Sequence, residues 1–145
     1  MRLVLAFLLV LGASPASAGE VAMAMHGNWC GPRHFGGPVV DVLDAACRRH
    51  DLCVAKAGYL DCGCDLDFMD ELRHIRWPSE ALYQKGRAIY EAISVAPCND
   101  AEGMAKKLEW GANDRLGALL SGREPLFSSV DRFFKLLSEG QVTTD

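Results

Sequence analysis

Residues 44–53 read DAACRRHDLC, and residues 61–65 read DCGCD. Apolar residues in and around the first stretch recur at about the 3.6-residue period of a helix. We expect this helix to begin near Asp41 and to stop at Gly58. A second helical segment should begin near Asp61. The two stretches therefore predict neighbouring helices joined by a short turn.

Two cysteines near the start of the second helix have different orientations. A helix turns by about 100° per residue, so Cys62 and Cys64 face opposite sides and should bond different partners. If Cys64 bonds Cys53, the disulfide holds the two helices together as an antiparallel pair. Asp65, next to Cys64, would then come within reach of the imidazole of His50, one turn before Cys53.

Asp51 follows His50 directly and therefore projects about 100° away from it. An adjacent His-Asp pair on its own is usually a solvated surface feature. The glycine- and proline-rich residues 26–38, HGNWCGPRHFGGP, predict a loop with exposed carbonyls. If Cys30 bonds Cys47, this loop lies beside the helix, and its carbonyls with the Asp51 carboxylate form an oxygen-only site suited to Ca²⁺.

The N-terminus has the pattern of a secretory signal peptide. An apolar run at residues 3–12 is followed by small residues at 13–18, and the run is too short to span a bilayer. We therefore expect residues 1–18 to be a signal peptide and residues 19–145 to form one domain. The net charge of −4 gives no overall basic field, so we expect no nucleic-acid partner.

The cysteines indicate an oxidising compartment. All 6 lie after the signal peptide, at positions 30, 47, 53, 62, 64 and 98. An even number after a signal peptide predicts three disulfides and a secreted protein, extracellular or periplasmic. The CGC spacing does not match that of a zinc ribbon.

The remaining chain is predicted to be helical, and the fold class all-α. Pro78 should break the second helix at Trp77, after which the helical pattern resumes. Residues 100–121 show a weaker helical pattern. The last helix should begin at Pro125, and we interpret its apolar stripe as a core face. The stripe contains Leu126, Phe127, Val130, Phe133, Phe134 and Leu137.

Three motifs stand in a fixed order: CG in the glycine loop, LDAACRRHDLC, and CGCD. This arrangement resembles the secreted phospholipase A2 family, whose calcium loop, CCxxHDxC helix and CxCD helix follow the same order. The resemblance covers residues 26–72. The chain has no room for the N-terminal helix and the β-hairpin of the animal enzymes, so it is similar to the short bacterial, fungal or plant-like type.

The resemblance implies a role for each motif residue. His50 would activate a water molecule, and Asp65 would orient His50. Asp51 and three backbone carbonyls would bind Ca²⁺, and the backbone N–H of Gly31 would donate to the oxyanion. The three carbonyls would come from Trp29, Gly31 and Arg33. The disulfides implied are Cys30–Cys47 and Cys53–Cys64, which leave Cys62 and Cys98 as the third pair.

The chain departs from the family pattern at three positions. Ala46 replaces the first cysteine of the paired CC. Val54 replaces a tyrosine that supports the orienting carboxylate, a role for which Tyr59 is the available substitute. Arg33 replaces a loop glycine, whose position can require a positive φ.

The function implied is hydrolysis of the sn-2 ester of glycerophospholipids to a fatty acid and a lysophospholipid, by a calcium-dependent monomer acting at a phospholipid membrane surface or micelle. No GxSxG motif indicates a serine nucleophile. The apolar residues 21–25 and the helix that carries Phe133 and Phe134 are two candidates for the wall beside the acyl chain, and we favour the first. The alternative is a non-catalytic module of similar fold that binds lipid or a receptor.

Overall fold

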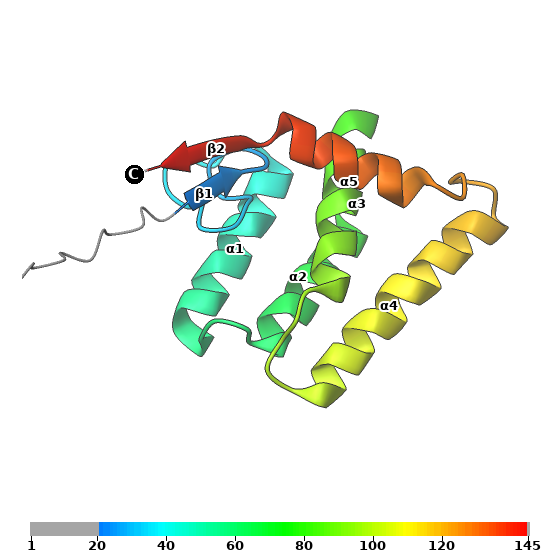
Figure 1. Cartoon of the computed structure of the whole chain (residues 1–145), viewed down its shortest axis with the longest axis horizontal. Helices are drawn as coiled ribbons and strands as arrows, with labels where there is room; N and C mark the ends of the chain where they lie inside the picture. The colour runs from blue at the N-terminus through cyan, green and yellow to red at the C-terminus, as the bar shows by residue number, and fades with distance from the viewer. Residues whose placement is uncertain (1–20, 145) are drawn as a thin grey trace, which may run out of the picture.

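The computed structural model describes residues 21–144, and it is mostly helical, as the sequence predicts (Figure 1). The predicted signal peptide, residues 1–18, lies outside the described residues. The elements are β1 (Val21–Ala24), α1 (Val42–Ala57), α2 (Cys62–His74), α3 (Glu80–Val95), α4 (Ala101–Leu120), α5 (Ser128–Glu139) and β2 (Gln141–Thr144).

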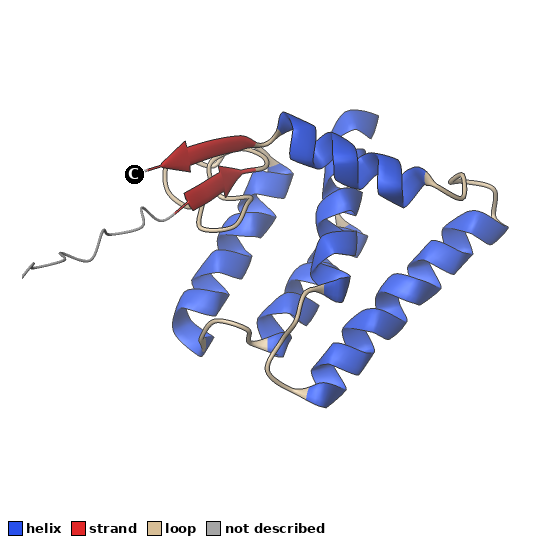
Figure 2. Ribbon diagram, in the orientation of Figure 1, coloured by secondary structure: helices blue, strands red, loops and turns tan. Residues whose placement is uncertain are grey.

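The two short strands were not predicted. They pair antiparallel, with Met23 opposite Val142, and lie beside the N-terminal end of α1 (Figure 2). Each strand has 4 residues, which is too short for an alternating pattern to stand out in the sequence. The sheet joins the end of the chain to the segment that leads into the glycine loop.

Helix α1 has the bounds that the sequence predicts. The side chain of Asp41 caps its first turn by accepting hydrogen bonds from the N–H groups of Leu43 and Asp44. Gly58 ends the helix with a φ of 114°, a conformation that glycine adopts without strain.

Helices α1 and α2 form an antiparallel pair. The Cys53–Cys64 disulfide joins them near the turn, and the ion pair between Arg49 and Glu71 joins them further from it. The earlier residue of α1, Arg49, thus contacts the later residue of α2, Glu71, as expected for antiparallel helices. These bonds keep the two helices in a fixed register.

Helix α3 begins after the predicted break at Pro78. Helix α2 ends at His74, and the side chain of Ser79 caps α3 by accepting from the N–H of Leu82. A disulfide between Cys62 and Cys98 ties the segment before α4 to the start of α2. The three disulfides are therefore the pairs that the family resemblance implies, and such bonds are typical of an oxidising compartment.

The core lies mainly between α1, α2 and α3. Its buried side chains include Leu43, Phe68, Met69, Leu72, Ile89 and Tyr90, and Leu136 of the C-terminal helix also packs into it. Within residues 21–144, no helix combines the length and the apolar character needed to cross a membrane.

The interpretation of the C-terminal stripe as a core face is wrong. Helix α5 begins at Ser128, three residues after Pro125, and the whole stripe is exposed, including Phe133 at 46% and Phe134 at 65%. The buried residues of α5 are Arg132 and Leu136. The helix therefore packs through a mixed charged and apolar face, which an apolar periodicity does not detect.

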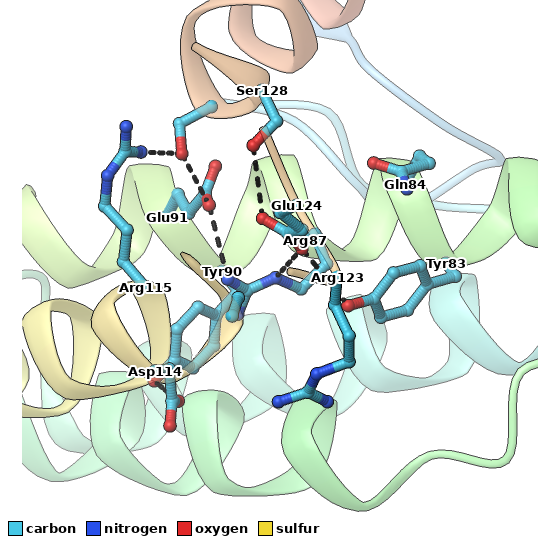
Figure 3. Close-up of polar contacts among 12 residues, drawn as sticks. Tyr83, Gln84, Arg87, Tyr90, Glu91, Asp114, Arg115, Arg123, Glu124 and Ser128 are labelled. Atoms are coloured by element: carbon cyan, nitrogen blue, oxygen red, sulfur yellow. Dashed lines mark hydrogen bonds and ion pairs between the residues drawn. The ribbon is translucent and has the colours of Figure 1, made fainter. Parts of the chain in front are cut away.

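Ion pairs explain why α5 buries an arginine. Arg132 pairs with Glu91 of α3 and with Glu124, whose carboxylate lies 2.8 Å away. Figure 3 shows how Glu124 also meets Arg87 and Ser128, so one carboxylate connects α3 with the segment that leads into α5. Charges buried in this way are stable only while they remain paired.

We expect Arg132→Met to lower the free energy of unfolding by roughly 3–5 kcal/mol, since it leaves Glu91 and Glu124 without this cation. Lys135→Met is the matched control, because Lys135 lies on the same helix with its side chain 71% exposed. Urea unfolding of both variants measures the difference. Equal stability of the two variants would show that the network contributes nothing.

Candidate active site

His50 lies between two carboxylates on the inner side of α1. Its Nε2 is 2.9 Å from Asp65 Oδ1, and its Nδ1 is 3.9 Å from Asp51 Oδ1. A carboxylate only accepts hydrogen bonds, so Nε2 carries a proton and Nδ1 is left as the acceptor in the neutral ring. The ring also stacks on Phe68, with the centroids 4.7 Å apart. These contacts fix the orientation of the imidazole.

Asp65 is buried and uses both of its carboxylate oxygens. Oδ1 accepts from His50, and Oδ2 accepts from the ammonium group of Lys107. Burial by itself would raise the pKa of Asp65, but the hydrogen bonds from His50 and Lys107 outweigh it and hold this pKa below its ordinary value. Asp65 is therefore an ionised acceptor at neutral pH.

Lys107 of α4 is the second support of Asp65, and the sequence did not lead us to expect it. Its side chain is 0% exposed, and its Nζ also donates to the carbonyl of Ala96 at 2.8 Å. Tyr59, the available substitute for the tyrosine of the family pattern, is 85% exposed. A buried lysine supports the carboxylate of Asp65 instead.

Asp51 carries a buried oxygen that has no hydrogen-bond partner among the residues that the structure describes. The pKa of Asp51 is raised to about 6, mainly by burial and to a smaller extent by nearby Asp44, while His50 and His34 act in the opposite direction. A carboxylate in this position is stabilised by a nearby cation.

Asp44 shapes the loop that faces Asp51. Its buried carboxylate accepts hydrogen bonds from the N–H groups of Asn28, Trp29 and Val40, at distances of 3.0, 2.8 and 3.0 Å. The Cys30–Cys47 disulfide joins the same loop to α1. Residues 27–31 are therefore held against the helix that carries His50 and Asp51.

The loop backbone takes positive φ angles at two of the candidate ligand positions. Gly31 has a φ of 139°, and a Cβ there would clash with the carbonyl oxygen of Met23 in β1. Arg33 has a φ of 57°, so an arginine here adopts the left-handed conformation that glycine most readily takes. Having arginine rather than glycine at position 33 therefore does not prevent the positive φ angle there.

The donor set fits Ca²⁺. Trp29, Gly31, Arg33 and Asp51 all line one cavity, and the unpartnered oxygen of Asp51 is the kind of ligand that a hard cation binds. The described residues contain no cluster of three or more His, Cys, Asp or Glu side chains suited to a metal. A site made of one carboxylate and backbone carbonyls would not form such a cluster.

The cavity has a volume of about 380 Å³, and His50 lies in its wall. Much of the rest of the lining is apolar, and both segments considered for the acyl-chain wall contribute one side chain. Met25 follows β1, and Leu136 belongs to α5. Phe133 and Phe134 are not part of this lining. Other apolar lining residues are Phe68, Ile89 and Ile93.

The chain matches no protein-family model, and it matches no curated protein and no solved structure. The family resemblance therefore rests on the order and spacing of the motifs in the sequence.

Two residues of the site, Asp44 and Lys107, were not predicted from the sequence, although the position of each in its helix could have indicated a role. Asp44 lies seven residues before Asp51, two turns along one helix face. Lys107 lies on the face of α4 that also bears the buried Gly103 and Ala118. A lone lysine among small residues on a helix face could have been recognised as a candidate buried cation.

Proposed function

We propose that the protein is a secreted, calcium-dependent phospholipase A2 that hydrolyses the sn-2 ester of glycerophospholipids. The observation that carries the proposal is the position of His50, held by Asp65 on one side and facing Asp51 on the other, in the wall of an apolar cavity. A general base, an orienting carboxylate and a candidate cation ligand thus meet at one place.

In the proposed reaction, Nδ1 of His50 takes a proton from a water molecule whose oxygen attacks the ester carbonyl carbon. The N–H of Gly31 donates a hydrogen bond to the oxyanion that develops there. When the bond to the glycerol oxygen breaks, His50 returns the proton to that oxygen. The products are a fatty acid and a lysophospholipid, and no acyl-enzyme forms.

Asp65 has a separate role in this proposal. Its negative charge keeps the proton of neutral His50 on Nε2, which leaves Nδ1 free to act as the base, and it stabilises the imidazolium that forms in the reaction. The residues that would hold Ca²⁺ are Asp51 and the carbonyls of Trp29, Gly31 and Arg33. When bound, the ion would polarise the ester carbonyl and stabilise negative charge on its oxygen.

The composition of the cavity supports a lipid substrate. Each buried CH₂ group contributes about 0.8 kcal/mol, so an acyl chain gains from the apolar walls that Met25, Phe68 and Leu136 provide. The three disulfides and the N-terminal signal pattern support a secreted location.

We expect calcium affinity to fall by about tenfold between pH 7 and pH 5. The pKa of Asp51 is about 6 in the calcium-free protein, and only the deprotonated carboxylate binds the ion. An ordinary carboxylate would stay ionised over this range. Calorimetric titrations at the two pH values provide the measurement, and the His50→Gln variant shows whether titration of His50 contributes. Equal affinities at both pH values would argue against Asp51 as the ligand.

Release of fatty acid from phospholipid vesicles, with and without a calcium chelator, tests the proposed function. The non-catalytic alternative predicts vesicle binding without release.

A further inference from the structure

Lys107 is the most completely buried cation close to the proposed catalytic pair. Its side chain is 0% exposed, and it donates to Asp65 Oδ2 and to the carbonyl of Ala96. A buried ammonium group is costly unless it is paired and hydrogen-bonded. A methionine or leucine would fill the same space at a lower cost of desolvation, so packing alone does not explain a lysine here.

The contacts of Lys107 restrict the Asp65 carboxylate to one orientation, in which it can accept a hydrogen bond from His50. With Oδ2 committed to the ammonium group, Oδ1 is directed at Nε2 of His50, 2.9 Å away. Without the lysine, Oδ2 would be a buried acceptor without its cation, and the carboxylate could turn about its own side-chain bonds. The orientation of His50 depends on that carboxylate.

Lys107 also connects the catalytic pair to α4, a helix that contributes no residue to the lining of the cavity. It belongs to α4, and Ala96 is the residue that caps the C-terminal end of α3. The Cys62–Cys98 disulfide ties this α3–α4 junction to the first residue of α2, three residues before Asp65. The ammonium group is therefore held from a rigid junction.

We propose that Lys107 is a positioning residue, which fixes the carboxylate of Asp65 so that Asp65 holds His50 with Nδ1 directed into the cavity. Its effect on turnover rests on the proposed function, whereas its effect on the orientation of His50 does not. Lys107 itself does not touch the substrate in this proposal, because it acts only through Asp65.

A double-mutant cycle tests the proposal, with Lys107→Met, Asp65→Asn and the double variant. We expect Lys107→Met to lower kcat by about 10-fold or more, the scale of a misplaced catalytic group, with little change in KM or calcium affinity. In the Asp65→Asn background the same change should have almost no further effect on kcat, because the carboxylate it acts on is absent. If the fold-changes in kcat of the two single variants instead multiply in the double variant, the proposal is overturned. An unchanged kcat in Lys107→Met would also overturn it.

Lys106→Met is the matched control, since Lys106 is the preceding residue of α4 and is exposed. Its kcat should equal that of the wild type. Lys107→Gln serves as a second variant in the same cycle if Lys107→Met does not fold, because the amide keeps a donor without a buried charge. All rates are expressed per folded molecule, so that loss of stability is not counted as loss of turnover.

A readout without lipid separates this proposal from the proposed function. The Nε2–H proton of His50 can be followed by NMR, and it should exchange with solvent about 10-fold faster or more in Lys107→Met, while the backbone amides of α1 stay protected. If the wild type releases no fatty acid but this exchange accelerates, the proposed function fails and the positioning role stands. An unchanged exchange rate would overturn the positioning role.

Discussion

Replacing His50 by glutamine is expected to lower the turnover of phospholipid by about 100-fold or more, which is the scale of losing a general base. Glutamine keeps a polar side chain on α1 but offers no nitrogen that can take a proton from water. Its amide can still donate to Asp65, so the buried carboxylate is not left without a partner on this side. Calcium affinity and the cooperative unfolding transition should remain close to those of the wild type.

His74→Gln is the matched control for this experiment. His74 lies at the end of α2 with its side chain 73% exposed, and its imidazole contacts Asp70, one turn earlier on the same helix. Initial rates on mixed phospholipid vesicles, measured per folded molecule, compare the two variants. Comparable rates for His50→Gln and the wild type would place the base elsewhere.

Replacing Asp51 by asparagine is expected to weaken calcium binding by about 100-fold or more, because it removes the only side-chain charge proposed for the ion. Activity should fall with it. Isothermal titration calorimetry measures the affinity directly. Asp67→Asn is the matched control, since Asp67 is an exposed carboxylate on α2. Unchanged calcium affinity in Asp51→Asn would contradict the proposed site.

The stability of the same variant gives a second check, with a definite sign. The pKa of Asp51 in the folded protein is about 6, above the ordinary value of 3.8, so the group opposes folding as the pH rises through this interval. Asparagine has no charge to bury. At pH 7 and without calcium, the variant should therefore melt no lower than the wild type, and calcium should raise the melting temperature of the wild type alone.

The sequence predicts the helical part of the fold well because its signals are local. Asp41 and Gly58 are a cap and a stop, and Pro78 interrupts the chain where α2 has already ended. The spacing of Cys62 and Cys64 correctly predicts that they face opposite sides of the helix and bond different cysteines. Signals of this kind depend only on neighbouring residues, so tertiary packing does not change their meaning.

Two of the errors share one physical cause, which is that polar residues can be buried when they are paired. The stripe at Phe133 and Phe134 predicts a core face, but α5 buries Arg132 because Glu91 and Glu124 lie opposite it. In the same way, α4 buries Lys107 against Asp65. A hydrophobic period cannot reveal which charge has a partner, since Glu91 lies 41 residues from Arg132 and Asp65 lies 42 residues from Lys107.

Some residues of the candidate site were predicted from the sequence, and others were not. His50, Asp51 and Asp65 were predicted from motif spacing, and the structure brings all three together. Gly31 and Arg33 line the same cavity. Lys107 was missed because it lies outside all three motifs. Asp44 lies within LDAACRRHDLC but precedes the CCxxHDxC pattern, which assigns it no role.

Hydrolysis of a phospholipid with distinguishable acyl chains at sn-1 and sn-2 is the most direct test of the central claim. Vesicles of this lipid are incubated with the folded wild type in calcium, with a chelator, and with the chelator followed by excess calcium, and His50→Gln is assayed alongside. We predict release of the sn-2 fatty acid together with a lysophospholipid, loss of release in the chelator, recovery on addition of calcium, and near absence of release with His50→Gln. Vesicle binding by the wild type without release of either fatty acid in calcium would contradict the claim and favour a non-catalytic lipid-binding module.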